Sequence, residues 1–192
     1  MPCNCQNSNN NRPFDFVESI RVFNHISSTD ICDLDDPRME TQMGFVTEEY
    51  EELMEAFEEA FESTDYNELV GAADVLKELG DLVVVTIGAM VKLGADPTEV
   101  MKAVCESNMS KFCRSEEEAQ KTVDHIKEHH SDRYDAVFYE KSPLMPDLWV
   151  VKGHQIGYPG NKILKSIKSR KADSALTLLA SDLIAKWQED RV

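Results

Sequence analysis

The chain has 192 residues, which is enough for one domain of ordinary size with an appendage. Its 36 acidic and 20 basic residues give a formal net charge of −16. This balance argues against a general binder of nucleic acids or anionic membranes, because both partners are negatively charged, and it favours a divalent cation or an anion complexed with one.

The first predicted elements are a polar tail, a short helix and a loop. Residues 1–12 lack the apolar segment of a secretory signal, and we expect them to be disordered. A helix is predicted from about Phe14 to Ile26, and a polar loop from Ser27 to Thr41. The longest apolar run, Leu82 to Met90, is far shorter than the roughly 20 residues that span a bilayer. We therefore expect a soluble, cytoplasmic protein.

An acidic amphipathic helix is predicted next, and two of its glutamates differ from the rest. Each residue of a helix turns about 100° around the axis, so Glu49 and Glu52 fall on one flank of the apolar stripe. Ala56 and Ala60 continue this flank, and their small side chains leave room for another helix or a ligand. The stripe itself consists of Val46, Tyr50, Leu53, Phe57 and Phe61.

The following helix is apolar nearly all round from Leu79 to Met90, so we expect it to be buried. It nevertheless carries Asp74, Glu78 and Asp81 in one narrow stripe. A buried carboxylate without a partner is strongly disfavoured, and metal or basic partners are therefore expected here. In the alternative interpretation, Asp74 and Glu78 lie near an exposed end of the helix and are only solvated.

The two acidic pairs, Glu49-x-x-Glu52 and Glu78-x-x-Asp81, together suggest a cage for a divalent metal. A like-charged pair at i,i+3 weakens an isolated helix by about 0.2–0.5 kcal/mol. Two such pairs that faced each other would repel more strongly still. A bound cation would turn this repulsion into attraction.

Beyond these helices, the sequence predicts two further helices, a small antiparallel sheet and a final amphipathic helix. A helix from Asp96-Pro97-Thr98-Glu99 to about Phe112 has a capping residue and a proline at its first position. The capping-box pattern of Ser115 to Glu118 begins the next helix, which ends near His129 and His130. The remaining elements, two or three strands and the last helix, are predicted at 136–139, 148–151, 162–165 and 172–187.

Three motifs, in this order, resemble those of the all-α nucleoside triphosphate pyrophosphohydrolases, in the group of MazG and phosphoribosyl-ATP pyrophosphohydrolase. They are Glu48-Glu49-Tyr50-Glu51-Glu52-Leu53, Lys77-Glu78-Leu79-Gly80-Asp81-Leu82 and Ser107-Asn108-Met109-Ser110-Lys111. The resemblance covers about residues 14–112, and residues 160–166 resemble a segment that follows the helices in some members. Residues 113–157 are a long insertion relative to the common family pattern.

The expected fold is mainly α: a helical bundle of this pyrophosphohydrolase type, a small antiparallel β appendage and a C-terminal helix. We divide the chain into the tail, a helical catalytic domain, the β appendage and the last helix, with bounds at 1–12, 13–130, 131–171 and 172–192. The resemblance further implies a homodimer or homotetramer.

The resemblance implies that Glu49, Glu52, Glu78 and Asp81 bind Mg²⁺, with Mn²⁺ as a substitute. It also implies that the protein splits a nucleoside or deoxynucleoside triphosphate into monophosphate and pyrophosphate, as a housecleaning enzyme of the nucleotide pool. Mg²⁺ suits such a site because it combines carboxylate oxygens with substrate phosphates. A neighbouring acid, Glu48 or Glu49, would accept the proton of the attacking water.

Several polar residues are predicted to contact the substrate. Asn108 and Lys111 are three residues apart on one helix face and could touch the sugar or a phosphate oxygen. Lys162 and Lys165 belong to a basic cluster in an otherwise acidic chain. This cluster either clamps the triphosphate or pairs with an acidic face of another subunit, and both interpretations stay open.

Other functional classes fit the motifs less well. A carboxylate-bridged di-iron bundle needs Glu-x-x-His on two helices, and neither Glu49 nor Glu78 is followed by such a histidine. A non-catalytic acidic adaptor would leave all its acids solvated and bind no metal. A zinc site at His125 and His129 lacks the glutamate of the HExxH pattern, which favours two exposed histidines.

Overall fold

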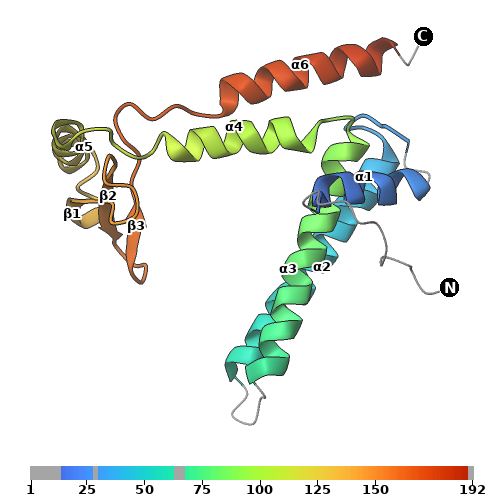
Figure 1. Ribbon diagram of the computed structural model, residues 1–192, viewed down its shortest axis with the longest axis horizontal. Helices are drawn as coiled ribbons and strands as arrows, with labels where there is room; N and C mark the ends of the chain where they lie inside the picture. The colour runs from blue at the N-terminus through green and yellow to red at the C-terminus, as the bar shows by residue number, and fades with distance from the viewer. Residues whose placement is uncertain (1–13, 28–29, 63–67, 190–192) are drawn as a thin grey trace. The chain divides into compact units, whose positions relative to one another are not determined.

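The computed structural model describes residues 14–27, 30–62 and 68–189. These residues form a mainly α protein with a small sheet and a C-terminal helix, which confirms the predicted fold class (Figure 1). In chain order the elements are α1 (Phe16–Ile26), α2 (Pro37–Glu62), α3 (Glu68–Lys92), α4 (Pro97–Met109), α5 (Glu116–His129), β1 (Tyr134–Lys141), β2 (Trp149–Gln155), β3 (Asn161–Ile163) and α6 (Asp173–Glu189).

The chain divides into two compact units. The first, called the helical unit, comprises the residues up to Pro97 together with those from Leu183 onward. The second, called the mixed unit, comprises Thr98–Asp182. The predicted disordered tail lies outside the described residues, and the domain bounds predicted at residues 130 and 171 stay predictions.

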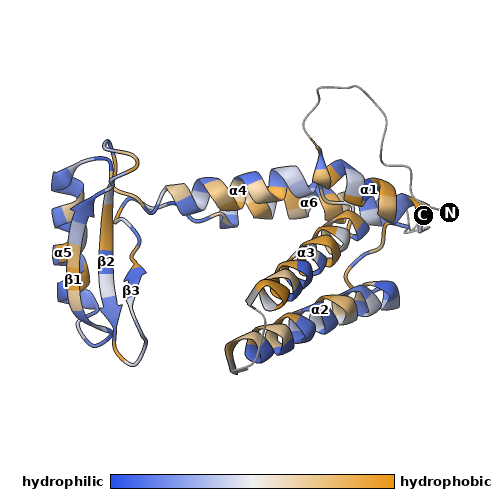
Figure 2. Ribbon diagram, turned by 60° about the horizontal axis from the view of Figure 1, so that its bottom comes forward, coloured by the Kyte–Doolittle hydropathy of each residue, from blue (hydrophilic) through white to orange (hydrophobic). Residues whose placement is uncertain are grey.

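In the helical unit, α2 and α3 pack side by side, and α1 packs against α3 (Figures 1 and 2). The helix predicted from about Phe14 to Ile26 is confirmed as α1. It is capped by Asp15, whose carboxylate accepts a hydrogen bond from the backbone N–H of Glu18 at 3.0 Å. The unit contains a small core of Cys32, Met39 and Ala89, with Leu93 packed against it.

Helix α2 begins earlier than the sequence analysis placed it. The loop predicted from Ser27 to Thr41 is wrong at its end, because the helix starts at Pro37. Asp36 caps this start by accepting a hydrogen bond from the backbone N–H of Arg38 at 2.8 Å. The Asp-Pro pair is itself a signal for a helix start, since proline fits the first helical position.

The predicted burial of α3 is only partly correct. Toward its C-terminal end, Ile87 and Ala89 are 6% and 8% exposed. Nearer its N-terminal end, Leu79 and Val83 remain 44% and 48% exposed. The packing partners of α3 in the helical unit, α1 and α2, thus leave much of the apolar surface of α3 open in a single chain.

The mixed unit contains most of α4, α5, the start of α6 and a small three-stranded sheet of order β1-β2-β3. The sheet is antiparallel, as predicted. Helix α5 contacts β1 and β2 and supplies three of the seven residues of an apolar core. This core consists of Cys113, Ala119, Val123, Ile126, Val137, Val151 and Leu164. The predicted cap of α5 is confirmed, because Ser115 Oγ accepts a hydrogen bond from the N–H of Glu118 at 3.2 Å.

The C-terminal end of α6, from Leu183 onward, is part of the helical unit. Trp187 Nε1 donates a hydrogen bond to the carbonyl oxygen of Leu93 at 3.1 Å, just beyond the end of α3. The helix runs two residues past its predicted end at Trp187. In the part of the chain that the structure describes, no helix combines the length and apolarity that crossing a bilayer requires.

Candidate metal centre

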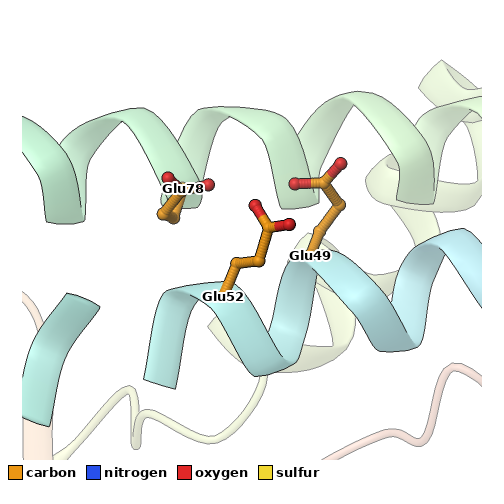
Figure 3. A group of neighbouring side chains, drawn as sticks. All are labelled: Glu49, Glu52 and Glu78. Atoms are coloured by element: carbon orange, nitrogen blue, oxygen red, sulfur yellow. The ribbon is translucent and has the colours of Figure 1, made fainter. Parts of the chain in front are cut away.

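Three glutamates meet between α2 and α3 (Figure 3). Glu49 and Glu52 come from α2 and extend toward α3, where Glu78 faces them. Each glutamate offers one carboxylate oxygen such that the three oxygens lie within 4.8 Å of one another. The i,i+3 spacing puts Glu49 and Glu52 on one side of α2, and in the structure this side faces Glu78 of α3.

The three carboxylates repel one another. Burial raises the pKa of Glu49 above its ordinary value, and the charges of Glu52, Asp81 and Glu78 raise it further. A carboxylate whose pKa is raised in this way loses its proton at a cost to the folded state. The cluster is therefore strained electrostatically, and a cation would relieve that strain.

Glu78 shows most directly that a cation fits here. Its Oε1 accepts a hydrogen bond from the ammonium group of Lys77 at 2.8 Å. Its Oε2 is the one buried side-chain oxygen or nitrogen without a hydrogen-bond partner among the described residues. A buried carboxylate oxygen without a partner is costly, and an oxygen-rich group of three carboxylates is the donor set that Mg²⁺ or Mn²⁺ prefers.

Asp81, the fourth predicted ligand, lies beside this cluster and outside the group of three. Its Oδ2 is 3.0 Å from Nζ of Lys77, so one ammonium group bridges Glu78 and Asp81. Asp81 is near enough to raise the pKa of Glu49. Its role as a ligand stays a prediction.

Lys77 is the residue that the sequence analysis missed. The carboxylates of Glu78 and Asp81 raise its pKa. Its position in the sequence carried the signal, because a lysine four residues before an aspartate on a helix makes an i,i+4 pair. The ammonium group of Lys77 thus already compensates part of the negative charge of the acidic cluster.

Comparison with protein-family models identifies the segment that carries this cluster. Residues 29–108 match the model of phosphoribosyl-ATP pyrophosphohydrolase. This segment belongs to the all-α nucleoside triphosphate pyrophosphohydrolase superfamily. The match includes all of α2, α3 and the three glutamates, and it confirms the resemblance seen in the motifs. No curated protein gives a significant match to the chain.

Within this pyrophosphohydrolase segment, the other predicted catalytic residue lies outside the cluster. Glu48 is exposed on α2 and is not part of the group of three. Because it directly precedes Glu49, it points to a different side of the helix. Its role in proton transfer stays a prediction.

The predicted substrate-binding residues gather in the mixed unit, at or beyond the end of the pyrophosphohydrolase segment. Lys111 Nζ donates a hydrogen bond to Oδ1 of Asn108 at 2.6 Å, so these two residues lie on one face. Lys111, Lys162 and Lys165 line one cavity of the mixed unit. Asn108 is not among the residues that line it.

The structure also bears on the zinc alternative. The rings of His125 and His129 are stacked with their centroids 4.4 Å apart. A ring nitrogen of His129 is 3.0 Å from the carbonyl oxygen of His125. Among the described residues, the three glutamates form the one group of three or more His, Cys, Asp or Glu with suitable metal-ligand spacing.

Proposed function

We propose that this protein is a Mg²⁺-dependent pyrophosphohydrolase that cleaves a nucleoside or deoxynucleoside triphosphate into monophosphate and pyrophosphate. The observation that carries the proposal is the convergence of Glu49, Glu52 and Glu78, with oxygens within 4.8 Å of one another. The family match supports it independently, because it spans the same three residues. Housecleaning of the nucleotide pool is the role that we infer from this chemistry.

The composition of the cluster supports Mg²⁺, with Mn²⁺ as a substitute. All members of the group of three are glutamates, and hard divalent cations prefer such oxygen ligands. A few carboxylates suffice for Mg²⁺, because it keeps several waters and takes further oxygens from substrate phosphates. The absence of histidine from this described group disfavours the di-iron alternative.

In this proposal Glu49, Glu52 and Glu78 hold the cation, and Asp81 joins them from the next turn of α3. When bound, Mg²⁺ supplies neutralisation of phosphate charge and makes a water more acidic. Glu48 or Glu49 accepts the proton of the attacking water. Both residues are carboxylates on α2, a type of group that commonly acts as a general base.

The substrate is proposed at the level of a nucleotide with a triphosphate chain. The matching family model is named after phosphoribosyl-ATP, which makes that compound the second candidate. Both candidates carry the same triphosphate, so the carboxylate cluster would serve either one. The difference between them lies in the groups that recognise the remainder of the nucleotide.

The test measures pyrophosphate release from the common nucleoside and deoxynucleoside triphosphates and from phosphoribosyl-ATP, with Mg²⁺ present. Glu49→Gln, Glu78→Gln and Asp81→Asn remove proposed ligands, and we expect each to lower kcat/KM by about a hundredfold or more. Glu58→Gln is the matched control, because Glu58 is exposed on α2 outside the cluster. Turnover by the first three variants at the wild-type rate would refute the proposed site.

We further propose that the protein assembles as a homodimer or homotetramer. The support is the apolar surface that a single chain leaves open on the helical unit. Leu79 and Val83 of α3 are 44% and 48% exposed, and Phe57 of α2 is 52% exposed. Apolar surface on this scale is typical of an interaction face. A second copy of the chain would cover it.

A further inference from the structure

A second site follows from a cavity in the mixed unit. The cavity has a volume of about 470 Å³, which is within the usual range for small-molecule sites. Its walls come from α5, the start of β1, β3 and the segment after it, and Lys111 beyond the end of α4. Every residue that lines it lies beyond residue 108, where the family match ends.

The charge of this cavity is opposite to that of the chain. Four permanent cations line it, and no aspartate or glutamate does, although the chain has 36 acidic residues. His125 and His130 add two further ring nitrogen donors or acceptors. The cations are Lys111, Arg133, Lys162 and Lys165.

Two of these cations contact neutral amides rather than acids. Lys111 contacts the neutral amide of Asn108, and Lys162 lies 3.5 Å from the amide oxygen of Gln155. In the described ranges, no carboxylate forms an ion pair with any of the four cavity cations. Elsewhere in the same unit, Lys152 pairs with Glu140 at 2.5 Å. Glu118 contacts the lining residue Ser166, but its ion pair is with Lys168, which is not among the four. Four cations around one cavity repel one another unless an anion joins them.

The wall that carries Lys165 is held in place by its backbone. Leu164 N–H donates to the carbonyl oxygen of Val151 at 2.9 Å, and Ser166 N–H donates to that of Lys111 at 3.0 Å. Leu164 and Ser166 are 4% and 3% exposed, so both neighbours of Lys165 are buried. A site whose backbone is fixed in this way loses little freedom when a ligand binds.

We propose that this cavity binds an oligophosphate chain, either free or as the phosphate tail of a nucleotide. A singly charged anion would compensate only one of the cations, whereas a chain of two or three phosphates carries several negative charges in a short length. A long nucleic acid is disfavoured because the chain as a whole carries a charge of −16. The site is complete within the mixed unit and does not depend on the proposed hydrolysis.

The first test is calorimetric titration of the full chain with inorganic triphosphate in the presence of EDTA, so that no metal and no turnover contribute. The double variant Arg133→Gln/Lys165→Gln removes two exposed cations from the cavity. We expect it to weaken binding at least tenfold. Lys121→Gln/Lys127→Gln, on exposed α5 surface outside the cavity, also removes two positive charges and is the charge-matched control, which should stay within twofold of the wild type.

Three results would overturn the proposal: no binding by the wild type, equal binding by Arg133→Gln/Lys165→Gln, or an equal loss in Lys121→Gln/Lys127→Gln, which would indicate diffuse charge attraction. Circular dichroism of each variant verifies that it is folded.

A second arm separates this site from the metal centre. The variant Glu52→Gln/Glu78→Gln should keep its affinity for triphosphate within twofold in EDTA, because the cavity contains neither residue. Metal-free carboxylates repel phosphate, so a tenfold gain in that variant would show that triphosphate binds beside the carboxylates and would overturn the inference. Failure of hydrolysis in the same variant concerns the proposed function alone.

A third arm identifies the source of the phosphate chain by comparing ATP with inorganic triphosphate. Tighter binding of ATP that is lost in Arg133→Gln/Lys165→Gln supports a nucleotide whose base or sugar also contacts the cavity. Equal or weaker binding of ATP, lost in the same variant, supports the free oligophosphate. ATP binding that the variant leaves unchanged contradicts the site.

Discussion

The ammonium group of Lys77 lies 2.8 Å from Oε1 of Glu78. The other carboxylate oxygen, Oε2, is buried and has no hydrogen-bond partner among the described residues. One oxygen of the Glu78 carboxylate is therefore paired with a side-chain ammonium group, and the other is available to a further cation. Lys77 also reaches Asp81 at 3.0 Å. This places the lysine in competition with a divalent metal for two of the four predicted ligands.

Replacing Lys77 by glutamine removes this competition, so we expect Mg²⁺ to bind more tightly. Lys77 is 61% exposed, and exposed ion pairs are weak, so the gain should be about two- to fivefold in the dissociation constant. Isothermal titration of the full chain with Mg²⁺ measures it. Lys127→Gln changes the net charge equally but outside the cluster, and should leave the affinity unchanged. Weaker binding in Lys77→Gln would show that the lysine supports the site.

Neutralising Glu49 should stabilise the metal-free protein. Burial and the neighbouring carboxylates raise the pKa of Glu49, so its ionised form destabilises the folded state at neutral pH. Glu49→Gln removes one like charge from the cluster, and we expect the Tm in EDTA to rise by about 1–2 °C. The same variant should lose most of the increase in Tm that Mg²⁺ gives the wild type. Thermal melts with and without Mg²⁺ measure both effects, and a lower Tm in EDTA would contradict the first.

Helical spacing could predict that Glu49 and Glu52 lie together, but it could not predict that Glu78 faces them. Glu49 and Glu52 share a helix face because of the 3.6-residue period, and this could be read from α2 alone. That Glu78 faces them depends on how α2 and α3 are aligned, which no period within one helix specifies. The resemblance of the motifs supplied that link, and the geometry of the three glutamates agrees with it.

Helical periodicity was less successful for the burial of α3, because it considers one helix without its packing partners. An apolar helix was expected to be buried, yet Leu79 and Val83 keep nearly half of their surface. Apolar periodicity shows that a surface should be covered and does not say which chain covers it. The basic cluster of Lys162 and Lys165 was visible in the sequence, but the cavity was not, because it forms only through the pairing of β2 with β3 and the packing of α5.

If the open face of α3 is covered by a second copy, a charge placed there should separate the copies. We expect Val83→Glu to weaken self-association by about tenfold or more, because a buried unpaired charge is costly. Analytical ultracentrifugation over a concentration series measures this. Leu144→Glu is the control, since Leu144 is 90% exposed in the mixed unit. A wild-type chain that stays monomeric at high micromolar concentration would refute the assembly.

The mixed unit contains a buried acid of a different kind, with a structural role. Glu118 is 5% exposed, accepts a hydrogen bond from Ser166 Oγ at 2.5 Å and another from the N–H of Arg114 at 3.3 Å. Burial alone would raise the pKa of Glu118. The two hydrogen bonds and the charge of Lys168, 3.6 Å away, outweigh burial and hold that pKa below its ordinary value. The ionised carboxylate therefore stabilises the fold of this unit.

Glu118→Gln should accordingly lower the free energy of unfolding at pH 7 by about 1–3 kcal/mol, the usual range for hydrogen bonds to a charged group. A carboxylate with a depressed folded-state pKa contributes fully above its unfolded-state pKa, and its contribution is lost as the pH falls through the folded-state value. The difference between wild type and variant should thus be largest at neutral pH and shrink below about pH 4.

Urea unfolding followed by the fluorescence of Trp149 reports on this unit, because Trp149 packs against its core. A Trp187→Phe background removes the signal of the other tryptophan. Glu128→Gln, on exposed α5 surface, serves as the comparison and should change stability little at any pH. A stability difference for Glu118→Gln that grows on acidification would mean that the carboxyl is held protonated in the fold, contrary to its hydrogen bonds.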